Sequence, residues 1–396
     1  MRQNILFVEW QSFGNYFIKQ SFHKKGYSVE SIPLPRENID TRCDKTYTEQ
    51  LVHRILNGSY ACVFTFNYFP IVAIACKACK VPYISWTYDS PFVQLYSKTI
   101  GYETNFVFVF DSYTVRELRS MGYSNIYYLP MAVPDDYYIN LQKKKYNKKI
   151  YKNEISFVGS LYSEDFHNPF RKMKNLEGYY KGMIDAAVQA QRKVYGYNFL
   201  QEILIENTEL VKQIYQFCPV TITGDGLETI EWVYANYYLA RKVTAEDREQ
   251  LLKILSKYAH ITVYTPEKTN VSDIENRGKV DYYTEAPYVF KNSKINLNIT
   301  LRSIQTGIPL RAFDIMGNKG FLLTNYQEDY MEYFEPDKDF VMYGSYEEAV
   351  EKAVYYLKNE EERKKIANNG FDKVMKEHTY TDRVNVMCSF IEEYWR

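Results

Sequence analysis

The chain has 396 residues and carries 49 basic and 49 acidic side chains, so its formal net charge is zero. This length is more than one ordinary hydrophobic core accommodates, and it suits two α/β domains. The balanced charge gives no indication of a nucleic acid or an anionic membrane surface as a partner.

The sequence indicates neither a signal peptide nor a membrane span. The N-terminal run MRQNILFVEW leads directly into strand-like residues, and no stretch approaches the roughly 20 apolar residues that a spanning helix needs. The six cysteines lack the spacing of a disulfide framework, and the C-x-x-C pair of Cys76 and Cys79 lacks two further zinc ligands. We therefore expect a cytoplasmic protein in which Cys76 and Cys79 are packing residues.

Residues 1–135 alternate between strand-like and helix-like segments. The strand candidates are rich in Val, Ile, Phe and Tyr and are bounded by Gly, Pro or Asn: NILFV, YACVFTF, PYISW, NFVFVF and NIYYLP. Helical periodicity is found between them, for example in SYTVRELRSMG, where Asp111 is expected to cap the helix. This alternation predicts βαβ units and a parallel, doubly wound sheet.

Residues 136–152 form a strongly basic segment without apolar periodicity. Its lysines, in QKKKYNKK, could contact an anionic lipid or a nucleotide phosphate. We expect instead a solvated connector between two domains.

Residues 153–378 are expected to form a second domain of the same type. It opens with ISFVGSLY, and strand patterns resume in HITVYT, GKVDYY, INLNIT and GFLLT after a helical insertion at about 165–257. Ser345 and Glu348 form a capping-box pattern at the start of a later helix, and residues 379–396 form a final amphipathic helix. The architecture predicted is two Rossmann-like domains, with ligands bound at the carboxyl ends of the strands in a cleft between them.

The stretch RSIQTGIPLRAFDIMGNKGFLLTN combines a turn, a helix start and two charged residues. Gly307 permits a close backbone approach, and Pro309 suits the first helical position. The free N–H groups of a helix N-terminus attract an anion such as a diphosphate, and Arg311 adds a bidentate donor. Asp314 could accept two hydrogen bonds from a ribose diol. The alternative is that Arg311 and Asp314 only pair with each other at i, i+3 on a solvated face.

Several segments resemble the CgeB-like, spore-maturation-type glycosyltransferases. The most specific is SKINLNITLRSIQTGIPLRAFDIMGNKGFLLTN, and others are RKKIANNGFDKVMKEHTYTDRV, VPYISWTYDSP, FVFDSYTVRELRSMGYSNIYYLPMAV and ISFVGSLY. The resemblance covers most of the chain except the helical insertion. It implies an α/β fold of the GT-B type, a nucleotide-sugar donor held by the C-terminal domain, and transfer without a metal or other cofactor. The final helix would cross back to the N-terminal domain.

The resemblance also implies which residues hold the donor. Asp314 falls where better-known GT-B enzymes place the second of two glutamates eight residues apart, and the place of the first is taken by Thr306. The second glutamate holds the ribose. The departure at Thr306 leaves Gln305, Thr306 or the backbone to contact the sugar.

Loops of both domains supply further expected site residues. Gly159 and Ser160 match the glycine turn that lines the diphosphate, and Tyr283 lies in the loop that meets the nucleobase. Gly14 follows the first strand, where a glycine either lets the loop approach the reacting sugar or merely ends a turn. Asp89, in SWTYDSP, would activate the acceptor or stabilise positive charge at the anomeric carbon, unless it only caps a turn.

The sequence therefore predicts a glycosyltransferase that moves a sugar from a nucleoside-diphosphate sugar, with UDP as the expected nucleotide, to a protein, glycan or other cell-surface acceptor. Arg311 and Asp89 would be the catalytic residues, and no metal ligand is expected. A competing class is a non-catalytic GT-B-like protein that binds glycan or builds a surface layer or spore coat. A dinucleotide oxidoreductase is disfavoured because no G-x-G-x-x-G follows a strand.

Overall fold

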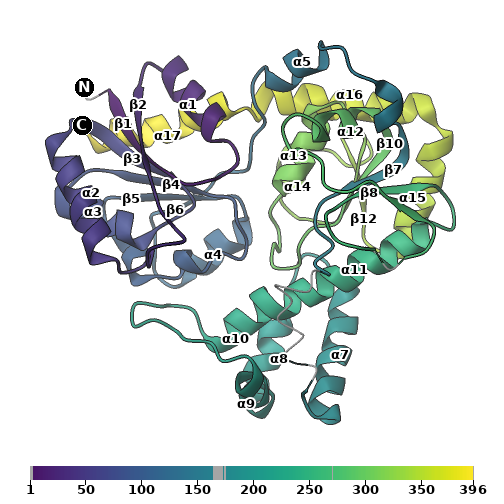
Figure 1. The fold of residues 1–396 in the computed structure, drawn as a ribbon, viewed down its shortest axis with the longest axis horizontal. Coiled ribbons are helices and arrows are strands. Elements are labelled where there is room, and N and C mark those ends of the chain that lie inside the picture. The colour runs from purple at the N-terminus through teal and green to yellow at the C-terminus, as the bar shows by residue number, and fades with distance from the viewer. Residues whose placement is uncertain (1–2, 164–172, 174, 270, 396) are drawn as a thin grey trace. The chain divides into compact units, whose positions relative to one another are not determined.

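The structure is a computed structural model that describes residues 3–163, 173, 175–269 and 271–395. The chain divides into two compact units. Unit 1 contains Met1–Asp135, Thr223–Glu228 and Glu377–Arg396, and unit 2 contains Asp136–Ile222 and Thr229–Lys376. Each unit is built around one sheet (Figure 1).

Unit 1 contains a parallel sheet of six strands in the order β2-β1-β3-β4-β5-β6. The strands are β1 (Asn4–Glu9), β2 (Ser28–Pro33), β3 (Tyr60–Phe66), β4 (Tyr83–Thr87), β5 (Asn105–Val109) and β6 (Ile126–Tyr128). The central strands β3 and β4 are buried along their whole length, which is typical of a parallel sheet with both faces covered. The strand order reverses at β1, and ligands of such sheets bind beside this point, at the carboxyl ends of the strands.

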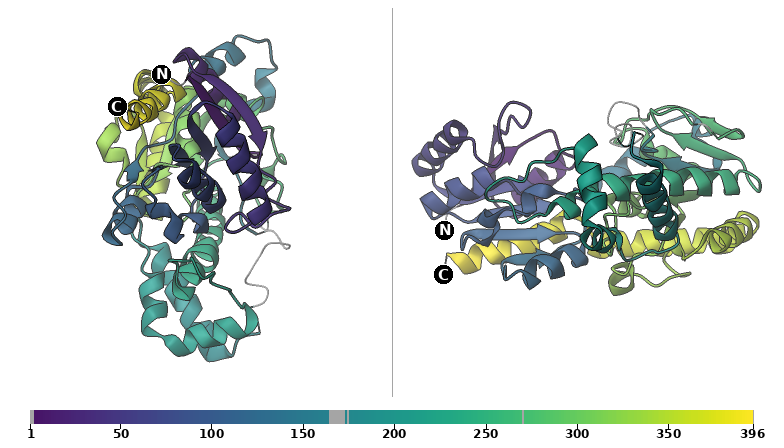
Figure 2. Two further views of the ribbon diagram at one scale, coloured as in Figure 1. Left: turned by 90° about the vertical axis from the view of Figure 1, so that its left-hand side faces the viewer. Right: turned by 90° about the horizontal axis from the view of Figure 1, so that it is seen from below.

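Helices cover both faces of this sheet. The helices of unit 1 are α1 (Asn15–Lys24), α2 (Lys45–Asn57), α3 (Pro70–Cys79), α4 (Ser112–Ser120) and the C-terminal α17 (Tyr380–Tyr394). Right-handed crossovers place α1 on one face and α2 and α3 on the other, and α17 packs beside α1 (Figure 2). The Asp111 carboxylate accepts the N–H of Tyr113 at 3.1 Å, which confirms the predicted cap of α4.

Unit 2 contains a second parallel sheet, with the order β12-β11-β10-β7-β8-β9. Its strands are β7 (Asn153–Val158), β8 (Ile261–Tyr264), β9 (Ile274–Asn276), β10 (Ser293–Asn298), β11 (Leu322–Asn325) and β12 (Val341–Tyr343). From β7 the chain adds β8 and β9 on one side and then returns to pair β10 with the other side. The switch point of this sheet therefore lies between β7 and β10.

The prediction of a strand in GKVDYY is wrong. These residues form a turn, because the Asp281 carboxylate accepts hydrogen bonds from the N–H of Tyr283 at 3.1 Å and the N–H of Thr284 at 2.8 Å. A side chain that binds the following backbone N–H groups in this way competes with strand pairing. The strand of this region, β9, lies just before the turn.

The basic segment at residues 136–152 differs in part from a solvated connector. Its first half forms α5 (Tyr137–Gln142) within unit 2, and there the side chains of Tyr138 and Leu141 are buried. The lysines that follow, at 143–145 and 148–149, are exposed.

The helical insertion lies between β7 and β8. It contains α7 (Gly178–Arg192), α8 (Leu200–Glu206), α9 (Thr208–Phe217), α10 (Ile230–Val233) and α11 (Ala240–Leu255). Helices α7 to α9 share a hydrophobic core and extend away from the sheet of unit 2 (Figures 1 and 2). Helix α11 joins the two cores, because Val243 packs in the insertion and Leu251 packs on the sheet.

The other helices of unit 2 complete its α/β layers. They are α12 (Ala286–Asn292), α13 (Leu310–Gly317), α14 (Tyr330–Tyr333), α15 (Tyr346–Lys358) and α16 (Glu360–Glu377). The capping pattern predicted for α15 is half realised: the Ser345 hydroxyl accepts the N–H of Glu348 at 3.1 Å, but the Glu348 carboxylate accepts the N–H of Gly344. Within the described ranges, no helix is long and apolar enough to cross a membrane.

Candidate functional site

The candidate site lies at the carboxyl ends of β7 and β10 in unit 2. These strands pair in parallel, so the loops that follow them leave the sheet at the same edge. The loop after β7 carries Gly159 and Ser160, and the loop after β10 carries residues 303–307 and leads into α13. This edge is also the switch point of the sheet, where ligands of doubly wound folds bind.

The turn at residues 303–307 is held in place through its backbone. The Gln327 side chain donates hydrogen bonds to the carbonyl oxygens of Ile304 and Gly307, each at 3.1 Å. The N–H of Asp329 donates to the carbonyl oxygen of Thr306 at 3.0 Å. The β11 end of the sheet thereby fixes the course of this turn.

The side chains of Gln305 and Thr306 face the protein interior. Their exposed fractions are 6% and 1%. The Gln305 amide oxygen accepts the N–H of Asn198 at 2.9 Å, which connects the turn to the helical insertion. Contact of either side chain with a donor sugar stays a prediction.

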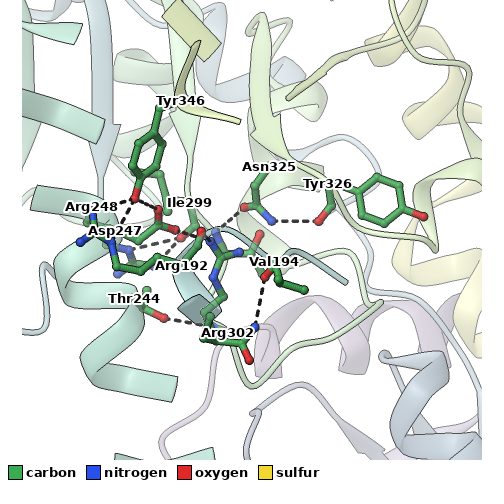
Figure 3. A network of polar contacts seen from close by, with 12 residues as sticks. Arg192, Val194, Thr244, Asp247, Arg248, Ile299, Arg302, Asn325, Tyr326 and Tyr346 are labelled. Atoms are coloured by element: carbon green, nitrogen blue, oxygen red, sulfur yellow. Dashed lines mark hydrogen bonds and ion pairs between the residues drawn. The ribbon is translucent and has the colours of Figure 1, made fainter. Parts of the chain in front are cut away.

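A buried ion pair anchors the start of the same loop (Figure 3). The Arg302 guanidinium lies 2.9 Å from the Asp247 carboxylate, and the two side chains are 5% and 0% exposed. Asp247 also accepts the hydroxyl of Tyr346 at 2.7 Å. Arg302 donates further to the carbonyl oxygen of Arg192 and, through its N–H, to the hydroxyl of Thr244. The loop after β10 is therefore attached to α7, α11 and α15 together.

Arg248, on α11, joins the two loops of the site. Its guanidinium donates to the carbonyl oxygen of Ser160 at 2.5 Å and to that of Ile299 at 2.6 Å (Figure 3 shows Ile299). Burial lowers the pKa of the Arg248 guanidinium, and the nearby charge of Arg311 lowers it further. The side chain is thus a buried cation beside a second cation at the end of β7.

Arg311 reaches the end of β7 because residue 159 is a glycine. Gly159 has φ of +151°, and a Cβ atom at this position would overlap the Arg311 guanidinium. The guanidinium carbon lies 6.0 Å from the centre of the Tyr282 ring. Within the described residues, the buried Nε of Arg311 has no hydrogen-bond partner.

The charges at this edge favour an anion. Neither Arg248 nor Arg311 forms an ion pair with a carboxylate in the described ranges. The first turn of α13 begins after Pro309 with no side-chain cap, so its N–H groups add partial positive charge. The Arg311 guanidinium and the helix N-terminus can donate hydrogen bonds to a diphosphate, and Arg248 adds positive charge without a donor of its own, because its N–H groups are bound to carbonyl oxygens.

Asp314 is a buried carboxylate that receives two tyrosine hydroxyls. Tyr138 of α5 donates to it at 2.7 Å, and Tyr282 donates to its other oxygen. The side chain is 2% exposed, so a pair with Arg311 on a solvated face is the wrong alternative. Burial raises the pKa of Asp314 to about 6, although both hydrogen bonds and the Arg311 charge oppose this rise.

This raised pKa makes the stability of the fold depend on pH. The folded state keeps the Asp314 proton up to pH about 6, whereas the unfolded chain loses it near the ordinary value of 3.8. The contribution of Asp314 to the unfolding free energy therefore falls as pH rises through this window, by at most about 3 kcal/mol. Asp314→Asn does not titrate and keeps an oxygen acceptor. We expect urea unfolding to show that wild type loses stability relative to Asp314→Asn between pH 4 and pH 7.

A constant stability difference between the two proteins across that window would contradict the burial of this carboxylate. Burial raises the pKa of Tyr282 well above its ordinary value, so this hydroxyl does not titrate in the same window.

Two further predicted residues of unit 2 have local partners. The Ser160 hydroxyl donates to the Glu267 carboxylate in the loop after β8. Tyr283 lies in the turn before α12, next to Tyr282, with the two rings 5.6 Å apart. Their roles in binding a donor stay predictions.

Sequence reasoning missed Tyr138, Tyr282 and Arg248. Tyr138 lies in the basic segment that gave no apolar period, and Arg248 lies in a helical region without a ligand motif. Tyr282 is adjacent to the expected Tyr283, and only the turn at Asp281 decides which ring points inward. A single sequence does not show which residues from distant segments come together in the folded site.

In unit 1, Gly14 begins α1 with φ of +88°. A Cβ atom at Gly14 would collide with the hydroxyl of Tyr380 on α17 and press on the ring of Phe66. The close approach that this glycine permits is therefore to α17. Contact with a reacting sugar stays a prediction.

Asp89 follows β4 and is held by Asn67 at the end of β3. The Asn67 amide donates to the Asp89 carboxylate at 2.7 Å, and its oxygen accepts the N–H of Tyr88 at 3.1 Å. Burial raises the pKa of Asp89, while Asn67 and the charge of Arg36 hold it down. A carboxylate with a raised pKa at the carboxyl edge of the sheet is suited to accept a proton.

Comparisons with known proteins agree with this architecture. Residues 209–389 match the family described as glycosyl transferase-like. A glycosyltransferase from Rickettsia africae has 11% identity and a TM-score of 0.56, with 100% of this chain and 99% of that chain covered. A UDP-forming α,α-trehalose-phosphate synthase from Burkholderia xenovorans has 9% identity and a TM-score of 0.56, with both chains covered completely at 100%.

A third solved structure was determined with ligands. HepE from Anabaena, in complex with UDP and glucose, has 11% identity and a TM-score of 0.50, with coverage of 98% of this chain and 99% of that chain. No curated protein sequence matches the chain. The likeness in structure over the full chain confirms the expected α/β fold of the GT-B type. The match of residues 209–389 to the glycosyl transferase-like family indicates a glycosyltransferase.

Proposed function

We propose that this glycosyltransferase takes its sugar from a nucleoside-diphosphate sugar, with UDP as the nucleotide, and that unit 2 holds this donor. The observation that carries the proposal is the concentration of positive charge at the ends of β7 and β10. Arg311, Arg248 and the uncapped start of α13 surround the Gly159 turn, where a diphosphate needs such groups. The complex of HepE with UDP and glucose supports the same donor class.

Transfer requires that the departing diphosphate be stabilised as its negative charge grows. We assign this role to the Arg311 guanidinium and the first N–H groups of α13, with no metal. The guanidinium N–H groups of Arg248 are bound to backbone carbonyl oxygens. Arg248 therefore contributes a fixed positive charge and no hydrogen bond to the diphosphate. Asp89 of unit 1 would accept the proton of the acceptor hydroxyl.

The ribose of the donor is assigned to Asp314, with one condition. Both oxygens of this carboxylate already receive tyrosine hydroxyls. A ribose diol therefore binds there only when the Tyr282 side chain gives up its hydrogen bond. We also propose that the protein belongs to the CgeB-like group, because several of its segments resemble that group. The proposal includes a protein or glycan as the acceptor and a cytoplasmic location.

The donor can be tested with the purified protein. We expect UDP to raise the melting temperature more than ADP or GDP, and we expect one UDP-sugar to be hydrolysed slowly in the absence of an acceptor. Stabilisation by UDP without turnover of any UDP-sugar would favour the non-catalytic class. No response to any nucleoside diphosphate would overturn the proposal.

A further inference from the structure

Unit 1 contains an open pocket at the carboxyl ends of β1 and β2. Its volume is about 580 Å³, within the range of sites for small molecules. It is lined by Trp10, Gln11, Leu34, Pro35, Arg36, Glu37 and Asn38. Its polar groups are two amides, one guanidinium and one carboxylate, which suit a hydroxylated ligand better than an apolar one.

Trp10 forms a fixed wall of this pocket. Its indole N–H donates to the carbonyl oxygen of Phe66, at the end of β3, at 2.7 Å. Its carbonyl oxygen accepts the side-chain amide of Asn15 at 2.7 Å. The ring of Tyr88 stacks on it with a separation of 6.0 Å between ring centres. The indole is therefore held by Phe66 and Tyr88, and the Trp10 backbone is held by Asn15.

The Arg36 guanidinium lies over the Trp10 ring, and its N–H groups have no hydrogen-bond partner among the described residues. Its guanidinium carbon is 4.1 Å from the centre of the Trp10 ring and 5.6 Å from that of Phe69. A guanidinium over an aromatic ring keeps its N–H groups free in its own plane. Among the described residues, Arg36 forms no ion pair and no side-chain hydrogen bond. A planar, preorganised and unpaired guanidinium is a receptor for a carboxylate or a phosphate.

The acids near this pocket do not neutralise Arg36. Glu37 is exposed, and Glu9, at the end of β1, is paired with Lys19 at 2.9 Å. Asp89 is bound by Asn67, yet the charge of Arg36 lowers its pKa, so the two groups interact. Arg36 lies over the Trp10 ring on which Tyr88 stacks, and Asp89 follows Tyr88 in the chain, so an anion on Arg36 would bind near the proposed catalytic carboxylate.

We propose that this pocket binds the acceptor, and that the acceptor is a sugar with an anionic group, a carboxylate or a phosphate, held by Arg36. This inference rests on the proposed function, because it assigns the acceptor of that transfer. Trp10 would hold the guanidinium in place, and Gln11 and Asn38 would bind hydroxyls of the sugar. The anionic group fixes which hydroxyl is presented for transfer.

The pocket can be tested on the full chain without any nucleotide. The probes are glucuronate, glucose 6-phosphate and glucose, with affinity measured by calorimetry. We expect at least one of the two anions to bind tenfold or more tightly than neutral glucose. The anion that binds more tightly identifies a carboxylate or a phosphate as the recognised group. Equal affinity for all three sugars, or no binding of either anion, would overturn the proposal.

Variants separate Arg36 from general charge effects. Arg36→Gln should lose tenfold or more of the anion affinity, and Arg36→Lys should retain part of it, because it keeps the charge without the planar fork. Glu37→Gln should strengthen anion binding. Arg54→Gln is the matched control, because it removes an exposed arginine that pairs with Glu30 elsewhere in unit 1. Equal losses in the Arg36 and Arg54 variants would also refute the assignment.

This test is independent of the donor site. Anion binding that depends on Arg36, in a protein that ignores UDP, would retain the pocket and reject the proposed donor. Stabilisation by UDP without anion binding would do the reverse. During turnover, Arg36→Gln should raise KM for an anionic acceptor.

Discussion

Arg311→Ala is expected to reduce sugar transfer by about a hundredfold to a thousandfold while the protein remains folded. The reason is that this guanidinium is placed to stabilise the charge of the departing diphosphate, and loss of one such donor typically has an effect of this size. Its contacts with the rest of unit 2 are few, since its Nε has no hydrogen-bond partner in the described residues. Initial rates with a UDP-sugar and a circular dichroism spectrum measure the two effects.

The control for this substitution is Lys253→Ala. Lys253 is an exposed cation near the end of α11, so its loss changes the net charge of unit 2 by the same amount. We expect it to retain the wild-type rate. Unchanged turnover in Arg311→Ala would reject the role of Arg311. An equal loss of rate in both variants would show that the loss comes from the change in net charge and not from the position of Arg311.

Asp247→Ala is expected to lower the free energy of unfolding by about 3–5 kcal/mol, because it leaves the buried charge of Arg302 without its partner. The two side chains are 0% and 5% exposed, so water does not replace the lost contact. The Tyr346 hydroxyl loses its acceptor as well. Unfolding by urea measures the change, and weaker binding of UDP should accompany it because Arg302 begins the loop that carries the donor turn.

Two comparisons make this prediction specific. Lys364→Ala breaks an ion pair with Glu360 whose side chains are 58% and 60% exposed, and its cost should stay below about 1 kcal/mol. The double variant Asp247→Leu/Arg302→Met removes both charges and should recover much of the lost stability. A small cost for Asp247→Ala, similar to that of Lys364→Ala, would contradict the role of the pair.

The central strands and the edge strand β6 could be predicted from sequence, whereas the edge strands β2, β9 and β12 could not. Strands β3 and β4 are buried along their length, so they read as continuous apolar runs. Strand β2, SVESIP, has exposed and half-buried residues only, and β9 and β12 have three residues each. A short or solvated strand is specified by its neighbour in the sheet, and its own sequence carries little of that information.

The positions of the site loops were also predictable, but the environment of each side chain was not. The turn at residues 303–307 lies where the glycine placed it, and α13 starts one residue later than predicted, because Pro309 precedes its first helical residue. The burial of Asp314 depends on Tyr138 and Tyr282, which come from other segments of the chain. Likewise, Arg302 is neutralised by Asp247 of the helical insertion. One sequence carries no signal for such pairs, because the partners come from segments far apart in the chain.

The most direct test of the account is a crystal structure of the protein with UDP bound. We expect the diphosphate at the start of α13, beside Gly159, with Arg311 donating to its oxygens and the ribose near Asp314. A diphosphate bound at another edge of the protein, or an Arg311 guanidinium directed away from it, would contradict the proposed donor site.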